Sequence, residues 1–252
     1  MSSRFLNIDL DFFLDGIAYW PEGGRLSSEH YKPWSRDEVR EFLERRCLLK
    51  PRGKIPGRLA KNHDAAFDYW EELRHQSETL FPLELVHVDA HADLGLGDAS
   101  WRHIMEDVLR LPVSERPKAE RGPHRLSLAS YVAYAVACRW IKSIEYIHPP
   151  GGGDDLQSFL FREFSPSGGW LELKCFARED VGAALRSGNV VKHLRAVQPI
   201  SVEPSVPFRA VRAERWVAST PFDRAFLCQS PDYTPETSDA LLGVFADYID
   251  FT

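Results

Sequence analysis

Acidic residues and histidines alternate in one short segment, His87-Val88-Asp89-Ala90-His91-Ala92-Asp93. The segment overlaps an apolar run, Leu83 to Val88, that has the length and composition of a buried strand. Alternate residues of a strand share a face, so Asp89, His91 and Asp93 are expected to begin on one side of its carboxyl end. Carboxylate and imidazole groups together suit Mn²⁺, Fe²⁺ or Zn²⁺. The pattern predicts a metal site, and the alternative is a solvated acidic turn with an incidental histidine.

A second pair of carboxylates, Asp9 and Asp11, follows another apolar run, Phe5 to Asp9. A single residue separates them, so at a strand end they would face the same way. Two buried carboxylates a few ångströms apart cannot both stay ionised without a cation beside them. With Asp89 and Asp93 they make a set of carboxylates that balances two divalent cations in formal charge, whereas alone they could form a surface turn.

A further histidine, His63, lies directly before a segment with helical spacing of its apolar residues, Ala65 to His75. A histidine in this position is commonly a helix cap or a surface residue. The alternative is that His63 is a further metal ligand.

The elements that must position these residues alternate between strands and helices. The expected strands are 5–9, 83–88, 143–148, 170–176 and 222–228, and the expected helices are 35–49, 65–75, 101–109, 126–140, 179–186 and 235–248. Such alternation predicts an α/β domain with a mostly parallel central sheet. Ligands bind such a sheet at the carboxyl ends of its strands, which is where the acidic motifs fall.

The composition of the 252-residue chain, 44% hydrophobic and 27% charged, is ordinary for a globular protein. No apolar run is long enough to span a membrane and no signal peptide is evident, so we expect a cytoplasmic protein without membrane partners. The net charge of −6 argues against a nucleic-acid partner. The four cysteines are widely spaced and are predicted to be buried thiols.

Taken together, these motifs resemble the arginase superfamily, which also contains agmatinases and, more distantly, histone deacetylases. Ureohydrolases of this superfamily carry an upstream histidine, a DAHxD motif and a DxD motif around a dimanganese centre. The chain is more similar still to an arginase-like family marked by D-L-D-F-F and S-P-x-Y-T-P, the latter at Ser230 to Pro235. Some members of that family are peptide arginases, which convert arginine to ornithine in ribosomally made precursor peptides.

The resemblance implies a three-layer αβα arginase-like fold, with residues 1–252 forming a single metallohydrolase domain. In arginases the DxD strand follows DAHxD, whereas here Asp9 and Asp11 precede it. A circular permutation explains this, because a parallel strand can keep its place in the sheet while the chain termini move. The alternative is that Asp9 and Asp11 are not ligands and that the site is deacetylase-like, with a single metal.

The resemblance also implies the cofactors and the reaction. Two Mn²⁺ ions, or other divalent metals, would be held by Asp9, Asp11, His63, Asp89, His91 and Asp93. Asp89 and Asp9 would bridge the ions, His63 and Asp93 would complete one site, and His91 and Asp11 the other. A hydroxide bridging the metals, oriented by Asp93, would attack the guanidinium carbon and release urea.

Two further roles follow from the resemblance. His103, ten residues beyond Asp93, would give a proton to the leaving amine; the alternatives are a surface histidine and His148 as the donor. Asp232 would bind the guanidinium group of the substrate, although it could merely cap the next helix. Glu203 is a weaker candidate for that carboxylate.

The implied substrate and partner is an arginine-containing precursor peptide. Aromatic residues after the DxD strand, at Tyr19, Trp20, Tyr31 and Trp34, could line a groove for a peptide, or could be ordinary packing. The alternatives are a ureohydrolase on free arginine or agmatine, a deacetylase-like zinc amidohydrolase, and a binding protein with a structural metal. The sequence leaves the oligomeric state open.

Overall fold

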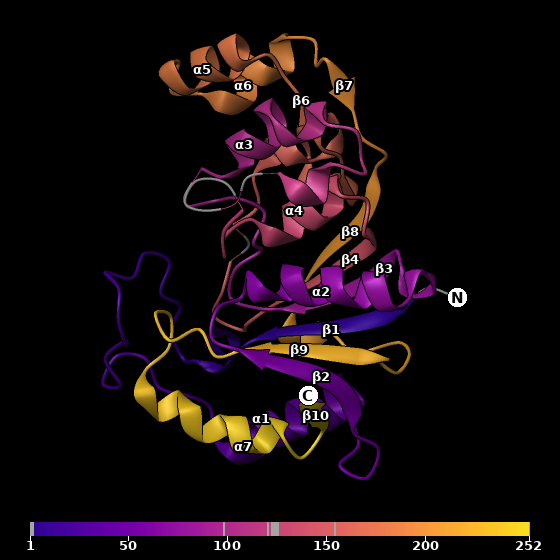
Figure 1. Cartoon of the computed structure of the whole chain (residues 1–252). Coiled ribbons are helices and arrows are strands. Elements are labelled where there is room, and N and C mark those ends of the chain that lie inside the picture. The colour runs from indigo at the N-terminus through magenta and orange to yellow at the C-terminus, as the bar shows by residue number, and fades with distance from the viewer. Residues whose placement is uncertain (1–2, 98, 120, 122–125, 154, 252) are drawn as a thin grey trace. The chain divides into compact units, whose positions relative to one another are not determined.

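The computed structural model describes residues 3–97, 99–119, 121, 126–153 and 155–251. Its architecture is α/β, with a mostly parallel eight-stranded sheet flanked by helices, as predicted (Figure 1). The strands are β1 (Arg4–Asp9), β2 (Ile55–Ala60), β3 (Leu83–Val88), β4 (Ile141–His148), β5 (Trp170–Leu171), β6 (Lys174–Cys175), β7 (Ser201–Val202), β8 (Val206–Arg212), β9 (Arg224–Cys228) and β10 (Ile249–Phe251). The helices are α1 (Arg36–Glu41), α2 (Ala65–Gln76), α3 (Trp101–Glu106), α4 (Tyr131–Ala137), α5 (Arg178–Arg186), α6 (Val190–Ala196) and α7 (Leu242–Phe245).

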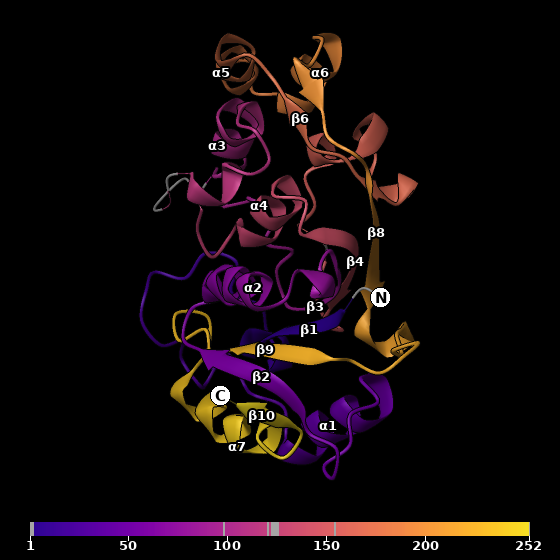
Figure 2. The same ribbon diagram turned by 45° about the vertical axis from the view of Figure 1, so that its right-hand side comes forward.

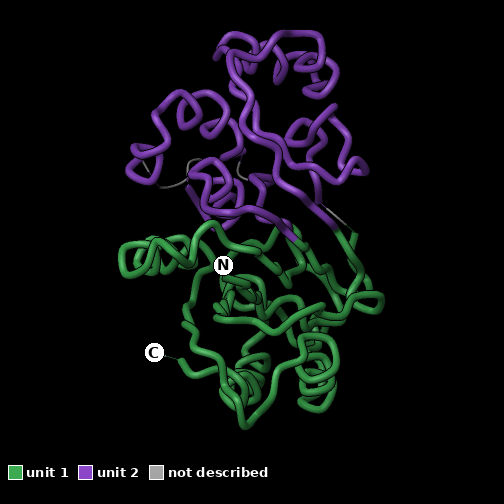
Figure 3. The backbone as a smooth tube through the Cα atoms, turned by 90° about the vertical axis from the view of Figure 1, so that its right-hand side faces the viewer, with its two compact units in different colours: residues 1–91, 145–154, 210–252 green, residues 92–144, 155–209 purple. Residues whose placement is uncertain are grey.

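The strand order in the large sheet is β10-β2-β9-β1-β3-β4-β8-β5, and β6 and β7 form a separate two-stranded sheet. The chain divides into two compact units (Figure 3). The first unit contains residues 1–91, 145–154 and 210–252, and the second contains 92–144 and 155–209. Strands β4 and β8 each contribute residues to both units, so the chain crosses from one unit to the other within each of these two strands.

In the first unit, β1 lies between β3 and β9 and runs parallel to both. Phe5 contacts α2, with its ring centroid 5.8 Å from that of Trp70. The alternate residues Leu6 and Ile8 belong to a hydrophobic core that includes Phe245 of α7. Figures 1 and 2 show α2 on one face of β1, β2 and β9, with α1 and α7 on the other. This unit is therefore a sheet between two helical layers.

The predicted start of the helix after Ser35 is confirmed. The Ser35 side chain accepts a hydrogen bond from the Glu38 backbone, and the Glu38 side chain bonds back to the Ser35 backbone. This capping box satisfies two backbone N–H groups that the first turn would leave without partners. Beyond α1 the helix continues as one π-helical segment, Phe42–Arg46.

The helices predicted at 65–75 and 179–186 are confirmed as α2 and α5. Those predicted at 101–109 and 235–248 are irregular, since a 3₁₀ segment, Val108–Arg110, follows α3 and another, Glu236–Leu241, precedes α7. None of the helices among the described residues has the length and apolar character needed to cross a membrane.

Two predicted elements are wrong in extent. The helix expected at 126–140 is confined to α4, because Ser127 and Ser130 form a hydrogen-bonded turn just before it. The strand expected at 170–176 is two short strands with different partners. β5 pairs with β8, whereas β6 pairs with β7. Hydrophobic pattern alone does not reveal that a strand changes partners.

Candidate metal centre

The carboxyl ends of four neighbouring strands meet at one edge of the first unit's sheet. In the order β2-β9-β1-β3 these strands are parallel, so their carboxyl ends lie at the same edge. Asp9 ends β1 and Cys228 ends β9, while Asp89 directly follows β3 and His63 follows β2 by three positions. Strand pairing therefore brings together side chains that are far apart in the sequence.

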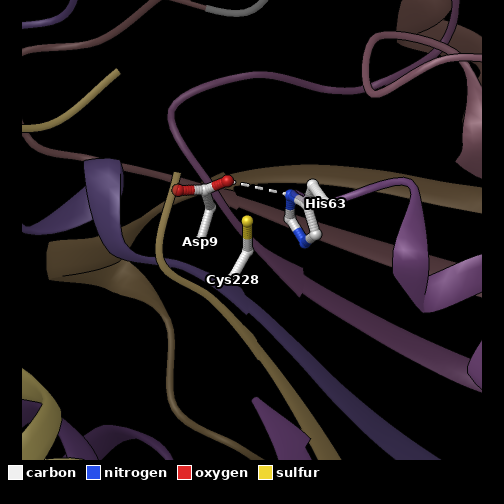
Figure 4. Close-up of side chains that lie close together, drawn as sticks. All are labelled: Asp9, His63 and Cys228. Atoms are coloured by element: carbon white, nitrogen blue, oxygen red, sulfur yellow. Dashed lines mark ion pairs between the residues drawn. The ribbon is translucent and has the colours of Figure 1, made fainter. Parts of the chain in front are cut away.

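One group of possible metal ligands is centred on His63. The His63 Nδ1 atom lies 3.0 Å from Asp9 Oδ2 and 2.9 Å from Asp89 Oδ2. Figure 4 shows Asp9 and His63 facing each other beside Cys228. The side chains of His63, Asp9 and Asp89 are all at least 95% buried, so water contributes little to neutralising the two carboxylates.

A second group of possible ligands adjoins the first. His91 Nδ1 lies 3.0 Å from Asp11 Oδ2 and 3.7 Å from Asp89 Oδ1. Asp89 therefore takes part in both groups, with one carboxylate oxygen in each. The same Asp89 Oδ1 accepts a hydrogen bond of 2.8 Å from the backbone N–H of His91, which fixes the carboxylate in the turn. Five of the six predicted ligands lie in these two groups, and their binding of a metal stays a prediction.

The sixth predicted ligand, Asp93, belongs to the second unit. Its side chain is buried and its backbone is left-handed, with φ of 51°. That conformation is costly for a residue other than glycine and often marks a functional position. The Asp93 carbonyl accepts a hydrogen bond from the backbone of Ala133 in the same unit. Its role as a ligand also stays a prediction.

Electrostatics in the first unit favour a cation at this edge. Burial raises the pKa of Asp11 well above its usual value, and the charges of Asp9 and Asp89 raise it further. Burial lowers the pKa of His91, but its hydrogen bonds to Asp11 and Asp89 outweigh burial and raise that pKa strongly. Without a metal, protons must therefore compensate the carboxylates. Divalent cations could replace those protons, since carboxylates and imidazoles bind metals in their deprotonated forms.

His87 lies within ligand distance of His63 and Asp89, but its hydrogen bonds occupy both ring nitrogens. Nδ1 is 3.0 Å from Asn7 Nδ2, and Nε2 is 3.0 Å from the His91 carbonyl oxygen. Burial lowers the pKa of His87 to about 4, so the ring is neutral at pH 7. A neutral imidazole has one donor and one acceptor, and both are used here.

Sequence reasoning did not assign Ser230 or Cys228 to this site. The Ser230 hydroxyl donates to Asp9 Oδ2, from a left-handed backbone with φ of 45°. Cys228 Sγ lies 3.1 Å from Ser230 Oγ and donates to the Lys61 carbonyl oxygen at 3.3 Å. Burial raises the pKa of the Cys228 thiol, and the charge of Asp9 adds to this. The strand predicted at 222–228 places both residues at a carboxyl strand end, but only its parallel pairing with β1 brings them next to Asp9.

The four cysteines are all buried free thiols, as predicted: Cys47, Cys138, Cys175 and Cys228.

Aromatic rings surround the His91 imidazole. The Tyr233 ring lies 5.2 Å from it at 70°, and the Tyr19 ring lies 5.7 Å from it at 89°. Tyr19 also lines two cavities in the first unit. One, of about 320 Å³, is lined by Trp34 and Pro149 among others, and the second, of about 350 Å³, runs along residues 18–27 and Tyr31. The aromatic loop predicted from the sequence therefore borders these two cavities, and one of its residues, Tyr19, contacts the predicted ligand His91.

The two candidate carboxylates for a guanidinium group have different surroundings. Asp232 is exposed, and its Oδ1 accepts a hydrogen bond of 3.1 Å from the backbone N–H of Gly24. Glu203, in the second unit, is buried and pairs with Arg116 at 2.7 Å and Arg139 at 3.0 Å. Those two arginines already compensate Glu203, so Asp232 remains the candidate.

The predicted proton donor, His103, lies on α3 in the second unit. Its Nδ1 is 3.0 Å from Asp107 Oδ2, and its buried Nε2 has no hydrogen-bond partner among the described residues. A carboxylate on one nitrogen fixes the orientation of the ring, which is the usual arrangement for a proton-transferring histidine. His148, the competing candidate, is buried at the end of β4.

Comparison with known proteins gives no relative: no family model, no curated protein and no solved structure matches the chain. The resemblance to arginases therefore rests on the sequence motifs alone. What the geometry itself defines is a buried cluster of carboxylates and imidazoles, at the carboxyl edge of a parallel sheet, within metal-binding distance.

Proposed function

We propose that the protein is a dinuclear-metal hydrolase that removes urea from arginine side chains in a peptide and leaves ornithine. The observation that carries this proposal is the shared position of Asp89. Its Oδ2 lies in a group with His63 and its Oδ1 in a group with His91. Two adjoining groups that share one carboxylate are the arrangement expected of a site for two cations.

The donor spacing fits cations of the predicted type. Ligand atoms at neighbouring corners of an octahedron lie about 3 Å apart when each bond to the cation is about 2.1 Å. The distances from His63 Nδ1 to its two carboxylate oxygens are 2.9 and 3.0 Å, and His91 Nδ1 lies 3.0 Å from Asp11 Oδ2. Mixed oxygen and nitrogen donors of this kind suit Mn²⁺, so we propose two Mn²⁺ as the resident cofactors.

In such a site the metals would supply a nucleophile at neutral pH by lowering the pKa of water. In the balanced reaction, a guanidine and water give urea and a primary amine. The bond that breaks is the one between the guanidinium carbon and the nitrogen that stays on the side chain. Ser230 donates its hydroxyl hydrogen to Asp9 and thereby orients that carboxylate. We propose His103 as the donor of the proton that the leaving amine takes up, because Asp107 already fixes its ring.

The surroundings of His91 favour a peptide over a free amino acid. Tyr19 contacts the His91 ring and lines two cavities, each large enough for a side chain. A peptide whose arginine reaches His91 could place its neighbouring residues in these two cavities, whereas free arginine would leave both empty. Asp232 is proposed to bind the guanidinium group through the carboxylate oxygen that does not bond Gly24.

The proposal is tested by incubating the Mn²⁺-loaded protein separately with arginine-containing peptides, free arginine and agmatine. We expect loss of one CH2N2 unit from the peptides by mass spectrometry, with one urea released per arginine lost. The matched control is Asp89→Asn, which keeps the side-chain shape.

Equal turnover of free arginine would show that the peptide part of the proposal is wrong. No urea from any guanidine, together with hydrolysis of acylated amines, would establish an amidohydrolase instead.

A further inference from the structure

Two consecutive main-chain carbonyls in the ligand-bearing turn accept hydrogen bonds from buried side chains. The Tyr146 hydroxyl donates to the Ala90 carbonyl at 3.0 Å. His87 Nε2 lies 3.0 Å from the His91 carbonyl oxygen. Tyr146 and His87 are each fully buried, and their rings lie 5.7 Å apart. These two hydrogen bonds hold the turn that follows β3, which ends at Val88.

The two hydrogen bonds of the His87 ring, to His91 and to Asn7, determine which of its nitrogens carries the proton. A carbonyl oxygen can only accept, so Nε2 donates to His91, and Nδ1 accepts from the side-chain amide that faces it. Asn7 Nδ2, 3.0 Å from Nδ1, supplies the matching donor. Asn7 and His87 are directly paired in the parallel register of β1 and β3, so the sheet itself holds this contact.

The same ring reaches the side chain of a predicted ligand. His87 Nε2 lies 3.4 Å from Asp89 Oδ2, the oxygen that faces His63. His87 therefore contacts the carboxylate of one predicted ligand and the backbone of the next, His91. Tyr146 binds the carbonyl of Ala90 between the two.

We propose that Tyr146 and His87 are positioning residues for the metal centre, holding the turn Asp89–His91 in the conformation that presents its two side chains to the cations. The inference rests on the proposed metal function. Hydrogen bonds that orient ligands typically contribute about 10- to 100-fold to metal affinity. His87 acts through its hydrogen bonds and is not itself a ligand.

The test is a calorimetric Mn²⁺ titration of the full-length, metal-stripped protein, with a parallel measurement of bound Mn²⁺ by electron paramagnetic resonance. The key variant is Tyr146→Phe, which removes one hydroxyl and keeps the ring. Its matched control is Tyr134→Phe, because the buried Tyr134 hydroxyl bonds the Arg116 carbonyl at 3.0 Å in the second unit, where neither residue is a predicted ligand. Both variants lose the same kind of hydrogen bond, so their thermal stabilities should fall alike.

We expect Tyr146→Phe to bind Mn²⁺ about tenfold more weakly than the unmodified protein, and Tyr134→Phe to bind it equally well. His87→Phe should weaken binding further, and His87→Gln should recover part of the loss, because an amide can donate to the His91 carbonyl.

Unchanged affinity in Tyr146→Phe, with two Mn²⁺ still bound by the unmodified protein, would refute the positioning role and leave the proposed function standing. An equal loss in Tyr134→Phe would also refute it. If the unmodified protein bound no Mn²⁺ at all, the proposed function and the positioning role would both be wrong.

Discussion

Replacing Asp89 by asparagine should affect two metal ions at once. The substitution preserves shape and leaves one oxygen able to accept the backbone N–H of His91, now 2.8 Å away. It removes the charge from a side chain whose two oxygens lie in separate groups of possible ligands. Asp11→Asn removes a carboxylate from the His91 group only.

The magnitude follows from the number of ligands. Structural zinc sites with four ligands contribute about 10–16 kcal/mol; on that scale one ligand accounts for about 3 kcal/mol, or roughly a 100-fold change in dissociation constant. For Asp89→Asn we expect this loss at both sites. For Asp11→Asn we expect one weakened site and one nearly unchanged site.

The assay is metal content by mass spectrometry after dialysis against a series of free Mn²⁺ concentrations, with circular dichroism to verify folding. At a Mn²⁺ concentration that saturates the unmodified protein, the Asp89 variant should retain almost none and the Asp11 variant about one ion. Loss of a single ion in Asp89→Asn, with the other bound as tightly as before, would refute the sharing of this carboxylate.

Three further outcomes are expected. His103→Ala should lower kcat by about 10²- to 10⁴-fold with unchanged Mn²⁺ content; full activity in steady-state assays would assign the proton transfer to another group. Removing both Mn²⁺ ions with a chelator should lower Tm by roughly 10–20 °C, since each ion at 100 times its dissociation constant stabilises by about 2.7 kcal/mol. An unchanged melting curve would contradict a site that binds only the folded chain. Hydrogen bonds to Asp11 and Asp89 raise the pKa of His91, so Mn²⁺ must displace the proton of His91 and the affinity for Mn²⁺ should rise with pH. The expected rise is about tenfold per pH unit for each proton released. Titrations at several pH values that give constant affinity would show that His91 is not a ligand.

Two central strands, β1 and β3, could be predicted because each is a short apolar run with an acidic residue at its carboxyl end. The strands at 5–9 and 83–88 are found almost as predicted, and the positions of Asp9 and Asp89 follow directly from them. Since parallel strands align their carboxyl ends, the meeting of the two motifs needed no knowledge of side-chain contacts. The motif spacing and this geometric rule were together enough to predict most of the candidate site.

The rest depended on which strands are neighbours. Ser230 and Cys228 approach Asp9 only because β9 pairs with β1, and the sequence does not state that pairing. The same holds for Asn7 and His87, whose contact arises from the register of β1 and β3. Hydrophobic pattern gives the face of each strand but not its partner, so residues whose role comes from a neighbouring strand were missed.

The hydrogen bond between Ser230 and Asp9 joins residues 221 positions apart in the chain. During translation, the carboxylates of β1 and β3 therefore leave the ribosome well before the strand that aligns Asp9. Until β9 takes its place in the sheet, any ion held by the nascent chain lacks this part of its surroundings. In the proposed metal site, the complete surroundings of an ion would therefore exist only in the finished protein, which would select its ion from those available where folding ends.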